Sequence, residues 1–169
     1  MDDRNSPASG VSSVTRAPSS ARSRRGQALV ETGIGIVLLV LITLSIVDAA
    51  RLFYIYLTLQ DGVTQATRYA VTGQTMDDPS NPSSKLSREE SIRQVMHNLT
   101  PGIPIDDGDI KFWDVTANKA GTGDHDDIIQ VTVTHRPQLI NPMLWPLVGG
   151  NGVITLQVSA TMKNEPFPN

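Results

Sequence analysis

One uninterrupted apolar segment limits what this chain can fold into. Residues 32–47, between Glu31 and Asp48, read TGIGIVLLVLITLSIV and contain no charged side chain. With residues 27–30 the segment has about 20 residues, enough for a helix to cross the ~30 Å hydrocarbon core of a membrane. The glycines within it are common in membrane helices. We therefore predict a transmembrane helix over 27–47.

The charge distribution predicts the orientation of this helix. Residues 1–26 contain five arginines and two aspartates, a charge of +3; the whole chain carries −3, so residues 27–169 carry −6. Positive residues beside a membrane helix favour the cytoplasmic side, so we expect residues 1–26 to be a cytoplasmic leader. Arginines in a Ser/Pro/Gly-rich stretch can also bind nucleic acid. Their position beside the apolar run favours the orienting role, and we expect no nucleic-acid partner.

A secretory signal is the alternative interpretation of the apolar run. The apolar core of a signal peptide has ~7 to 15 residues and ends at a small-x-small cleavage site. The run here is longer, and residues 47–50, VDAA, offer such a site only with an acidic residue beside the scissile bond. The sequence therefore favours a membrane helix.

Apolar periodicity continues beyond the membrane segment. Apolar and polar stripes alternate at spacings of three and four, which is typical of an amphipathic helix. The apolar positions are Leu52, Ile55, Leu59, Val63, Ala66 and Ala70. We predict one helix over about 28–72, whose extracytoplasmic amphipathic half is 48–73. Asp48 and Arg51 are three residues apart and can form an ion pair, and Gly73 fits a helix stop.

Residues 74–169 are expected to form an extracytoplasmic domain. After a Pro/Ser/Asn/Asp linker at 76–85, Ser87 and Glu90 have the spacing of a capping box at the start of a short helix. Alternating apolar residues predict strands. The predicted strands are 110–117, 128–135 and 154–163. The expected fold class is α+β, in which the long helix packs against a small antiparallel β-sheet accompanied by the short second helix.

Few residues suggest a catalytic, metal-binding or cofactor-binding site. The chain has no cysteine, so it has no disulfide, thiolate metal site or thiol nucleophile. The histidines lack metal-ligand spacing; they are His97, His125 and His135. The acidic loops at 105–109 and 121–127 carry oxygen ligands of the calcium type but do not fit the EF-hand pattern. We expect solvated turns there, no catalytic, cofactor-binding or metal-binding residue, and no enzymatic activity.

One loop is unusually apolar. Residues 138–150 read QLINPMLWPLVGG, and the two prolines argue against a regular helix. The loop either covers the core of the sheet or exposes a patch for a partner protein or the membrane surface. The candidate patch consists of Met143, Leu144, Trp145 and Leu147.

Several motifs in one order resemble a known family. They are a basic stretch, Gly26, QALVE at 27–31, the apolar run, DAARLFY at 48–54 and ATRYA at 66–70. This order resembles the TadE-like minor pilins, or pseudopilins, of the tight-adherence (Tad, or Flp) pilus system. VTVTHRP and the closing SATMKNE are also similar to the family, so the resemblance spans most of residues 24–165.

The resemblance implies a pilin-like fold and a cleaved precursor. In such precursors a membrane-embedded prepilin peptidase cuts after a glycine, and a glutamate occupies the fifth mature position. The matching residues are Gly26, with Gln27 as the new N-terminus, and Glu31. Glu31 would pair with an α-amino group and set the register of packed helices; alternatively, it lies at the membrane interface. Thr32, where the family has a bulky apolar residue, and the long leader depart from the pattern.

The implied function is that of a structural assembly protein. A minor pilin of a type IVb-like pilus would take part in pilus initiation, assembly and surface adhesion. Its partners would be other Tad pilins, the prepilin peptidase, the inner-membrane assembly platform and membrane lipid. It would reside in the bacterial cytoplasmic membrane and enter the pilus at the cell surface. The alternative is a permanently anchored scaffold or binding protein that keeps its leader.

Overall fold

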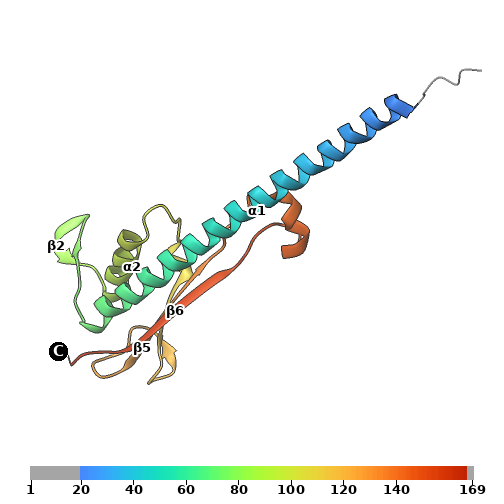
Figure 1. Cartoon of the computed structure of the whole chain (residues 1–169). Coiled ribbons are helices and arrows are strands. Elements are labelled where there is room, and N and C mark those ends of the chain that lie inside the picture. Colours follow the sequence, from blue (N-terminus) through green and yellow to red (C-terminus); the bar gives the residue numbers. More distant parts are fainter. Residues whose placement is uncertain (1–19, 167–169) are drawn as a thin grey trace, which may run out of the picture. The chain divides into compact units, whose positions relative to one another are not determined.

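The computed structural model describes residues 20–166, with only the backbone for residues 20–25 and Pro82. Most of the predicted leader, including Arg4 and Arg16, lies outside the described residues. The elements, in chain order, are α1 (Ser20–Val71), β1 (Asp77–Asp78), β2 (Asn81–Lys85), α2 (Arg88–Leu99), the 3-10 helix η1 (Asp107–Asp109), β3 (Ile110–Asp114), β4 (Lys119–Ala120), β5 (Ile128–His135), the 3-10 helix η2 (Pro142–Val148) and β6 (Leu156–Lys163) (Figure 1).

The described chain divides into two units, of which one ends at residue 40 and the other begins at residue 41. In the first unit, the described chain is helical throughout, and every side chain from Gly26 to Val40 is exposed. α1 is long and apolar enough to cross a membrane. The most apolar window of α1 has a mean hydropathy of 2.4, which fits a membrane anchor.

The end of α1 follows the prediction, whereas its start does not. Gly73 has φ +69°, and its N–H donates to the Ala70 carbonyl oxygen at 3.2 Å. This left-handed residue ends the helix without a Cβ clash. The start predicted at residue 28 was wrong, because the helix already includes the residues from Ser20.

The second unit is built around a four-stranded antiparallel sheet with the order β4-β3-β5-β6. Val131 in β5 pairs with Phe112 in β3 and with Ala160 in β6. Apolar residues on one face of the sheet share a core with the buried side chains of α1. These α1 residues are Ile55, Leu59, Val63, Ala66 and Ala70. The predicted α+β class and the packing of the sheet on the amphipathic half of the helix are confirmed (Figure 1).

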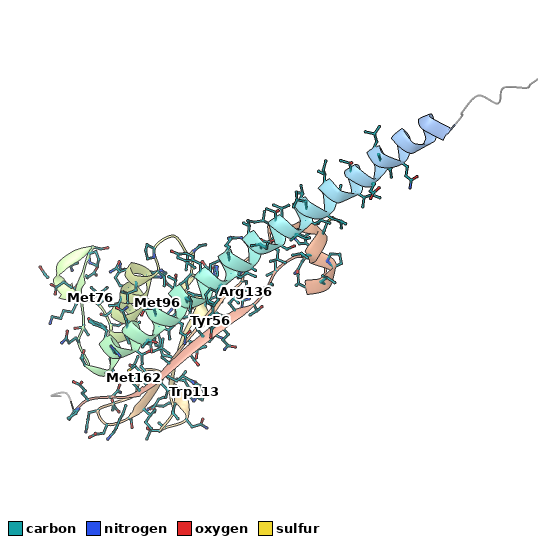
Figure 2. The ribbon with its side chains drawn as sticks, in the orientation of Figure 1. Tyr56, Met76, Met96, Trp113, Arg136 and Met162 are labelled. Carbon is teal, nitrogen blue, oxygen red and sulfur yellow. The ribbon has the colours of Figure 1, made fainter. Side chains whose placement is uncertain are left out.

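Helix α2 approaches α1 closely at a glycine. Ser87 caps α2 by accepting a hydrogen bond from the Glu90 N–H, as its position in the sequence predicts. Met96 lies on the side of α2 that packs against α1 (Figure 2). A Cβ on Gly62 would lie 2.8 Å from Thr100 Cγ2 and 3.1 Å from Met96 Cε. Glycine therefore permits this helix contact.

The structure departs from the predicted strands in four places, one of which is the short unpredicted strand β4. The predicted linker contains the hairpin β1–β2, where Asp78 accepts a hydrogen bond from the Ser80 N–H at 2.8 Å; such aspartate turns bring flanking strands together. Strand β3 ends early because Asp114 accepts the Ala117 N–H at 2.9 Å and forms a turn. Strand β6 begins at Leu156, two residues later than predicted.

Candidate processing and assembly site

Gly26, Gln27 and Glu31 lie on one exposed surface of α1, and Val30 and Ile34 complete it. A Cβ on Gly26 would meet no atom within 4 Å. Gln27 and Glu31 are four residues apart, so they are neighbours on the helix surface. Among the side chains that the structure describes, none forms an ion pair with Glu31. Within the described chain, its carboxylate is therefore unpaired in an otherwise apolar region.

Asp48 is the buried acidic residue at the end of the apolar run, with a side chain only 2% exposed. Its two carboxylate oxygens accept hydrogen bonds from the backbone N–H groups of Ile140 and Asn141, each at 2.8 Å. Two charge-assisted hydrogen bonds offset the cost of burying this carboxylate. These hydrogen bonds therefore attach the loop before η2 to α1.

Arg51, about one turn further along α1, also binds this loop. Its Nη1 donates to the Gln138 carbonyl oxygen at 2.9 Å. The predicted ion pair between Asp48 and Arg51 was wrong. The ion pairs of the described residues do not include one between these two side chains. The backbone of the loop offers Asp48 two donors in a buried site and Arg51 an acceptor, so each side chain binds the loop instead.

The chain after this loop forms η2 through side-chain caps. Asn141 accepts a hydrogen bond from the Met143 N–H at 3.1 Å and donates to Ser45 Oγ at 3.3 Å. Asn141 therefore caps η2 and also joins it to α1. A 3-10 helix forms despite Pro146, because a short 3-10 segment contains few backbone bonds for proline to break.

Trp145 closes the loop on itself. Its indole Nε1–H donates to the Leu139 carbonyl oxygen at 3.1 Å. Gly152 lies so close to the indole that an added Cβ would come within 2.3 Å of Trp145 Cδ1. The φ of Gly152 is +70°, so both its conformation and the ring favour glycine.

The apolar loop covers α1 rather than the sheet. Met143 and Leu144 line a surface pocket with residues from Leu41 to Ala49 of α1, and Figure 1 shows η2 (orange-red) beside this helix. The residues of η2 do not belong to the core shared by α1, α2 and the sheet. The interpretation that the loop covers the sheet was therefore wrong. Leu147 and Met143 remain 79% and 62% exposed.

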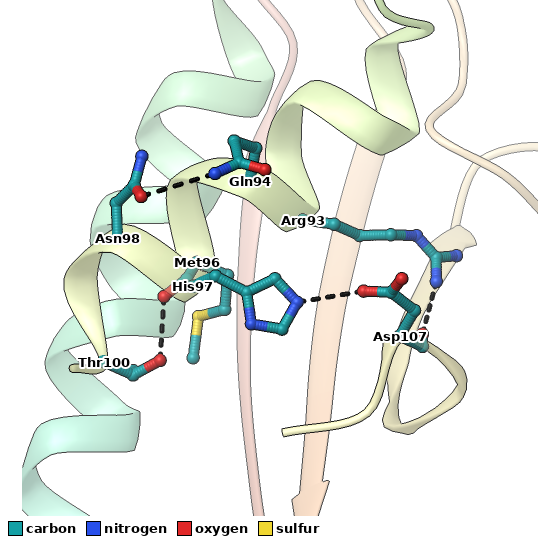
Figure 3. Close-up of polar contacts among 7 residues, drawn as sticks. All are labelled: Arg93, Gln94, Met96, His97, Asn98, Thr100 and Asp107. Atoms are coloured by element: carbon teal, nitrogen blue, oxygen red, sulfur yellow. Dashed lines mark hydrogen bonds and ion pairs between the residues drawn. The ribbon is translucent and has the colours of Figure 1, made fainter. Parts of the chain in front are cut away.

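His97 takes part in a polar cluster between α2 and η1 (Figure 3). Its Nε2 lies 2.9 Å from Asp107 Oδ1, and Arg93 donates to the Asp107 carbonyl oxygen. The guanidinium of Arg93 also lies over the Phe112 ring, 5.2 Å from its centroid. These contacts attach η1 to α2 and explain His97 as a structural residue.

The remaining acidic loop residues stabilise turns and ion pairs. Asp109 pairs with Arg136 at 2.8 Å, and Asp126 pairs with Lys163 at 2.9 Å. The hydrogen bond and charge of Lys163 lower the pKa of Asp126. Across residues 20–166, no group of three His, Asp or Glu side chains could hold a metal ion.

His135 lies at the end of β5, where it is partly buried. Burial is the largest effect on its imidazole and lowers its pKa, and the positive charge of Arg51 lowers it further. Asp109 and the backbone of Pro104 act in the opposite direction. The neutral imidazole is therefore favoured in the folded protein.

The model for the TadE-like protein family matches residues 26–68. The long helix carries a TadE-like segment. This segment begins at Gly26 and includes Glu31, Asp48 and Arg51, so the resemblance found in the sequence is confirmed there. No curated protein and no solved structure gives a significant match to the chain.

The TadE-like segment associates the chain with the Tad pilus system. The family is a pilus component rather than an enzyme family, so other pilus components are its implied partners. The single apolar helix near the N-terminus fits a membrane anchor in such a protein. The segment ends at residue 68, before α2 and the sheet begin.

Proposed function

We propose that the chain is the precursor of a minor pilin of a Tad pilus. A prepilin peptidase would cut between Gly26 and Gln27, and the mature subunit would then help to initiate or assemble the pilus and contribute to surface adhesion. The observation that carries this proposal is the TadE-like match, which begins at the glycine and places a glutamate five residues further on. Residues 1–26 would face the cytoplasm, and residues 48–169 would lie outside.

The cleavage step fits the local properties of Gly26. The residue is helical, and its surroundings leave it open on the side where a Cβ would project. Glycine weakens a helix by about 1 kcal/mol relative to alanine. A peptidase that needs an extended scissile bond therefore opens the helix at this residue more easily than it would if the residue were alanine.

The carboxylate of Glu31 would act after cleavage. Removing the leader creates a positive α-amino group on Gln27, one helical turn from Glu31. A charge at membrane depth costs at least ~2.5 kcal/mol, and pairing with this amine, or with that of a neighbouring subunit, reduces the cost for both groups. A buried pair of this kind favours one axial register among packed helices. In a membrane anchor that keeps residues 1–26, Gln27 has no free α-amino group with which Glu31 could pair.

Glu31→Gln tests this role because it keeps the side-chain size and removes the charge. The variant should insert and be cut normally, while cross-links to other pilins and surface pili fall by roughly tenfold, the loss expected for one charged hydrogen bond. Asp61→Asn is the matched control, since Asp61 is an exposed carboxylate of the same helix. Normal piliation by cleaved Glu31→Gln protein would remove Glu31 from the assembly mechanism.

A further inference from the structure

η2 and the loop before it contribute no charged side chain. From residue 137 to residue 162 the sequence contains no Asp, Glu, Lys, Arg or His. Within this stretch Ile140, Met143 and Leu147 are 52%, 62% and 79% exposed. Three large apolar side chains on a seven-residue helix and its flank would be costly to keep in water. We call these three residues the η2 patch.

The η2 patch lies beside the end of the apolar run of α1. Met143 and Leu144 line a pocket with α1 residues Leu41, Ile42, Ser45, Ile46 and Ala49. Leu41 lies six residues before Val47, the last residue of the run, which is about 9 Å along the helix axis. If this run spans the membrane, η2 is at the depth of the outer boundary, where interfacial helices bury their apolar faces by ~5–10 Å.

Polar groups close to the η2 patch form hydrogen bonds within the protein, so they do not need water at the membrane boundary. The bonds from Asp48 to Ile140 and Asn141 satisfy the carboxylate, and the indole N–H of Trp145 is bonded to the Leu139 carbonyl oxygen. Six to nine residues beyond Val47, roughly two turns, α1 exposes three aromatic side chains, which membrane proteins concentrate at the interface. They are Phe53, Tyr54 and Tyr56.

We propose that the η2 patch inserts into the outer leaflet and binds lipid. The occupant is lipid because the patch adjoins the last residues of the apolar run, from Leu41 onward, and its own segment contains no charged side chain. Asp48 and Arg51 hold η2 against α1, so the insertion depth is fixed by the helix. This inference rests on the membrane orientation in the proposed function, but it requires neither cleavage nor other pilins.

The absence of cysteine allows a single fluorescent label to test the proposal. Leu147→Cys places an NBD label on the patch at a highly exposed position, and Ser159→Cys places it on an exposed position of β6. Each full-length protein is reconstituted at low density in phosphatidylcholine vesicles. Emission is measured with nitroxide lipids labelled near the headgroup or deep in the acyl chain, and with a nitroxide in the aqueous phase.

The label at residue 147 should lose roughly half of its emission or more with the shallow nitroxide lipid, less with the deep one, and little with the aqueous quencher. The label at residue 159 should respond mainly to the aqueous quencher. Aqueous quenching of both labels would overturn the proposal. Protection at residue 147 without lipid quenching would assign the patch to contact between copies and would also overturn it. Because the vesicles contain no peptidase, these outcomes leave the cleavage proposal unaffected.

Discussion

The carboxylate of Asp48 accepts a hydrogen bond from the backbone N–H of Asn141, which is 93 residues later in the chain, at 2.8 Å. The same carboxylate accepts the N–H of Ile140. A single buried side chain thus connects the end of the apolar run of α1 to the loop that leads into η2. This connection positions the apolar loop where the apolar run of α1 ends.

Asp48→Asn should release this loop. The amide can accept only one of the two N–H groups and directs its own N–H₂ at the other, so the loss should be about 1.5–3 kcal/mol. Amide exchange at Ile140 and Asn141 should accelerate by roughly ten- to hundredfold, while exchange in β5 remains near the wild-type rate. Hydrogen-exchange mass spectrometry in nanodiscs measures both. Asp61→Asn is the control, and equal rates in the two variants would contradict the account.

Gly62→Ala should destabilise the protein despite the better helix propensity of alanine. Alanine adds about 1 kcal/mol of helix stability, but the new Cβ would lie 2.8 Å from Thr100 Cγ2. Thr100 is buried, and its hydroxyl donates to the Met96 carbonyl oxygen at 2.9 Å, so it has little room to move. Overpacking of this kind costs about 1–3 kcal/mol.

Denaturant unfolding in detergent measures the effect of Gly62→Ala. Gly108→Ala is the control because a Cβ on Gly108 meets nothing within 4 Å. Gly62→Ala should lower the midpoint, whereas Gly108→Ala should leave it nearly unchanged. A higher midpoint for Gly62→Ala would mean that α2 can move away from α1 at little cost.

The half of α1 beyond residue 47 should be indispensable to the fold of the second unit. Leu59, Val63 and Ala66 are almost completely buried in the core that the sheet also forms. A fragment of residues 74–169 would expose the opposite side of that core and should be insoluble or unfolded, whereas residues 48–169 should be soluble. A well-dispersed amide spectrum from the shorter fragment would contradict the packing.

Acidification should destabilise the protein through His135. Burial keeps the folded-state pKa of His135 below its ordinary value of 6.5, so the unfolded chain binds more protons between these two values. The contribution of His135 to stability is therefore complete above about pH 6.5 and declines as the pH falls through that window. His135→Gln should lose less stability than the wild type between about pH 7.5 and 5.5.

Thermal unfolding at the two pH values checks this prediction. His125→Gln is the control because His125 lies on an exposed loop, and it should retain the wild-type pH dependence. An unchanged pH dependence in His135→Gln would show that other groups account for the acid sensitivity.

Local patterns predicted the regular elements well. The three- and four-residue spacing of Leu59, Val63 and Ala66 identified the buried face of α1, because a helix repeats every 3.6 residues. The alternation in β5 predicted the bounds 128–135 that the structure has. Both signals are local in sequence and depend directly on which side chains the element buries.

Contacts between distant segments could not be predicted in this way. The sequence places Arg51 near Asp48 and gives no sign that both bind a loop about 90 residues later. One signal was present: Asn141 before Pro142 is a typical start for a helix, and it could have predicted η2. The hairpin β1–β2 depends on turns made by Asp78 and Asn81, which lack an apolar pattern.

The mass of the mature protein reveals whether the precursor is cleaved after Gly26. Intact mass spectrometry of protein from the membrane of a piliated cell should show a chain that begins at Gln27. Gly26→Ala should accumulate the full-length precursor, because the added Cβ meets the peptidase and not this chain. Gly33→Ala, where a Cβ also meets nothing within 4 Å, should be cut normally. A wild-type chain that retains residues 1–26 would contradict the proposed function and indicate a permanent membrane anchor.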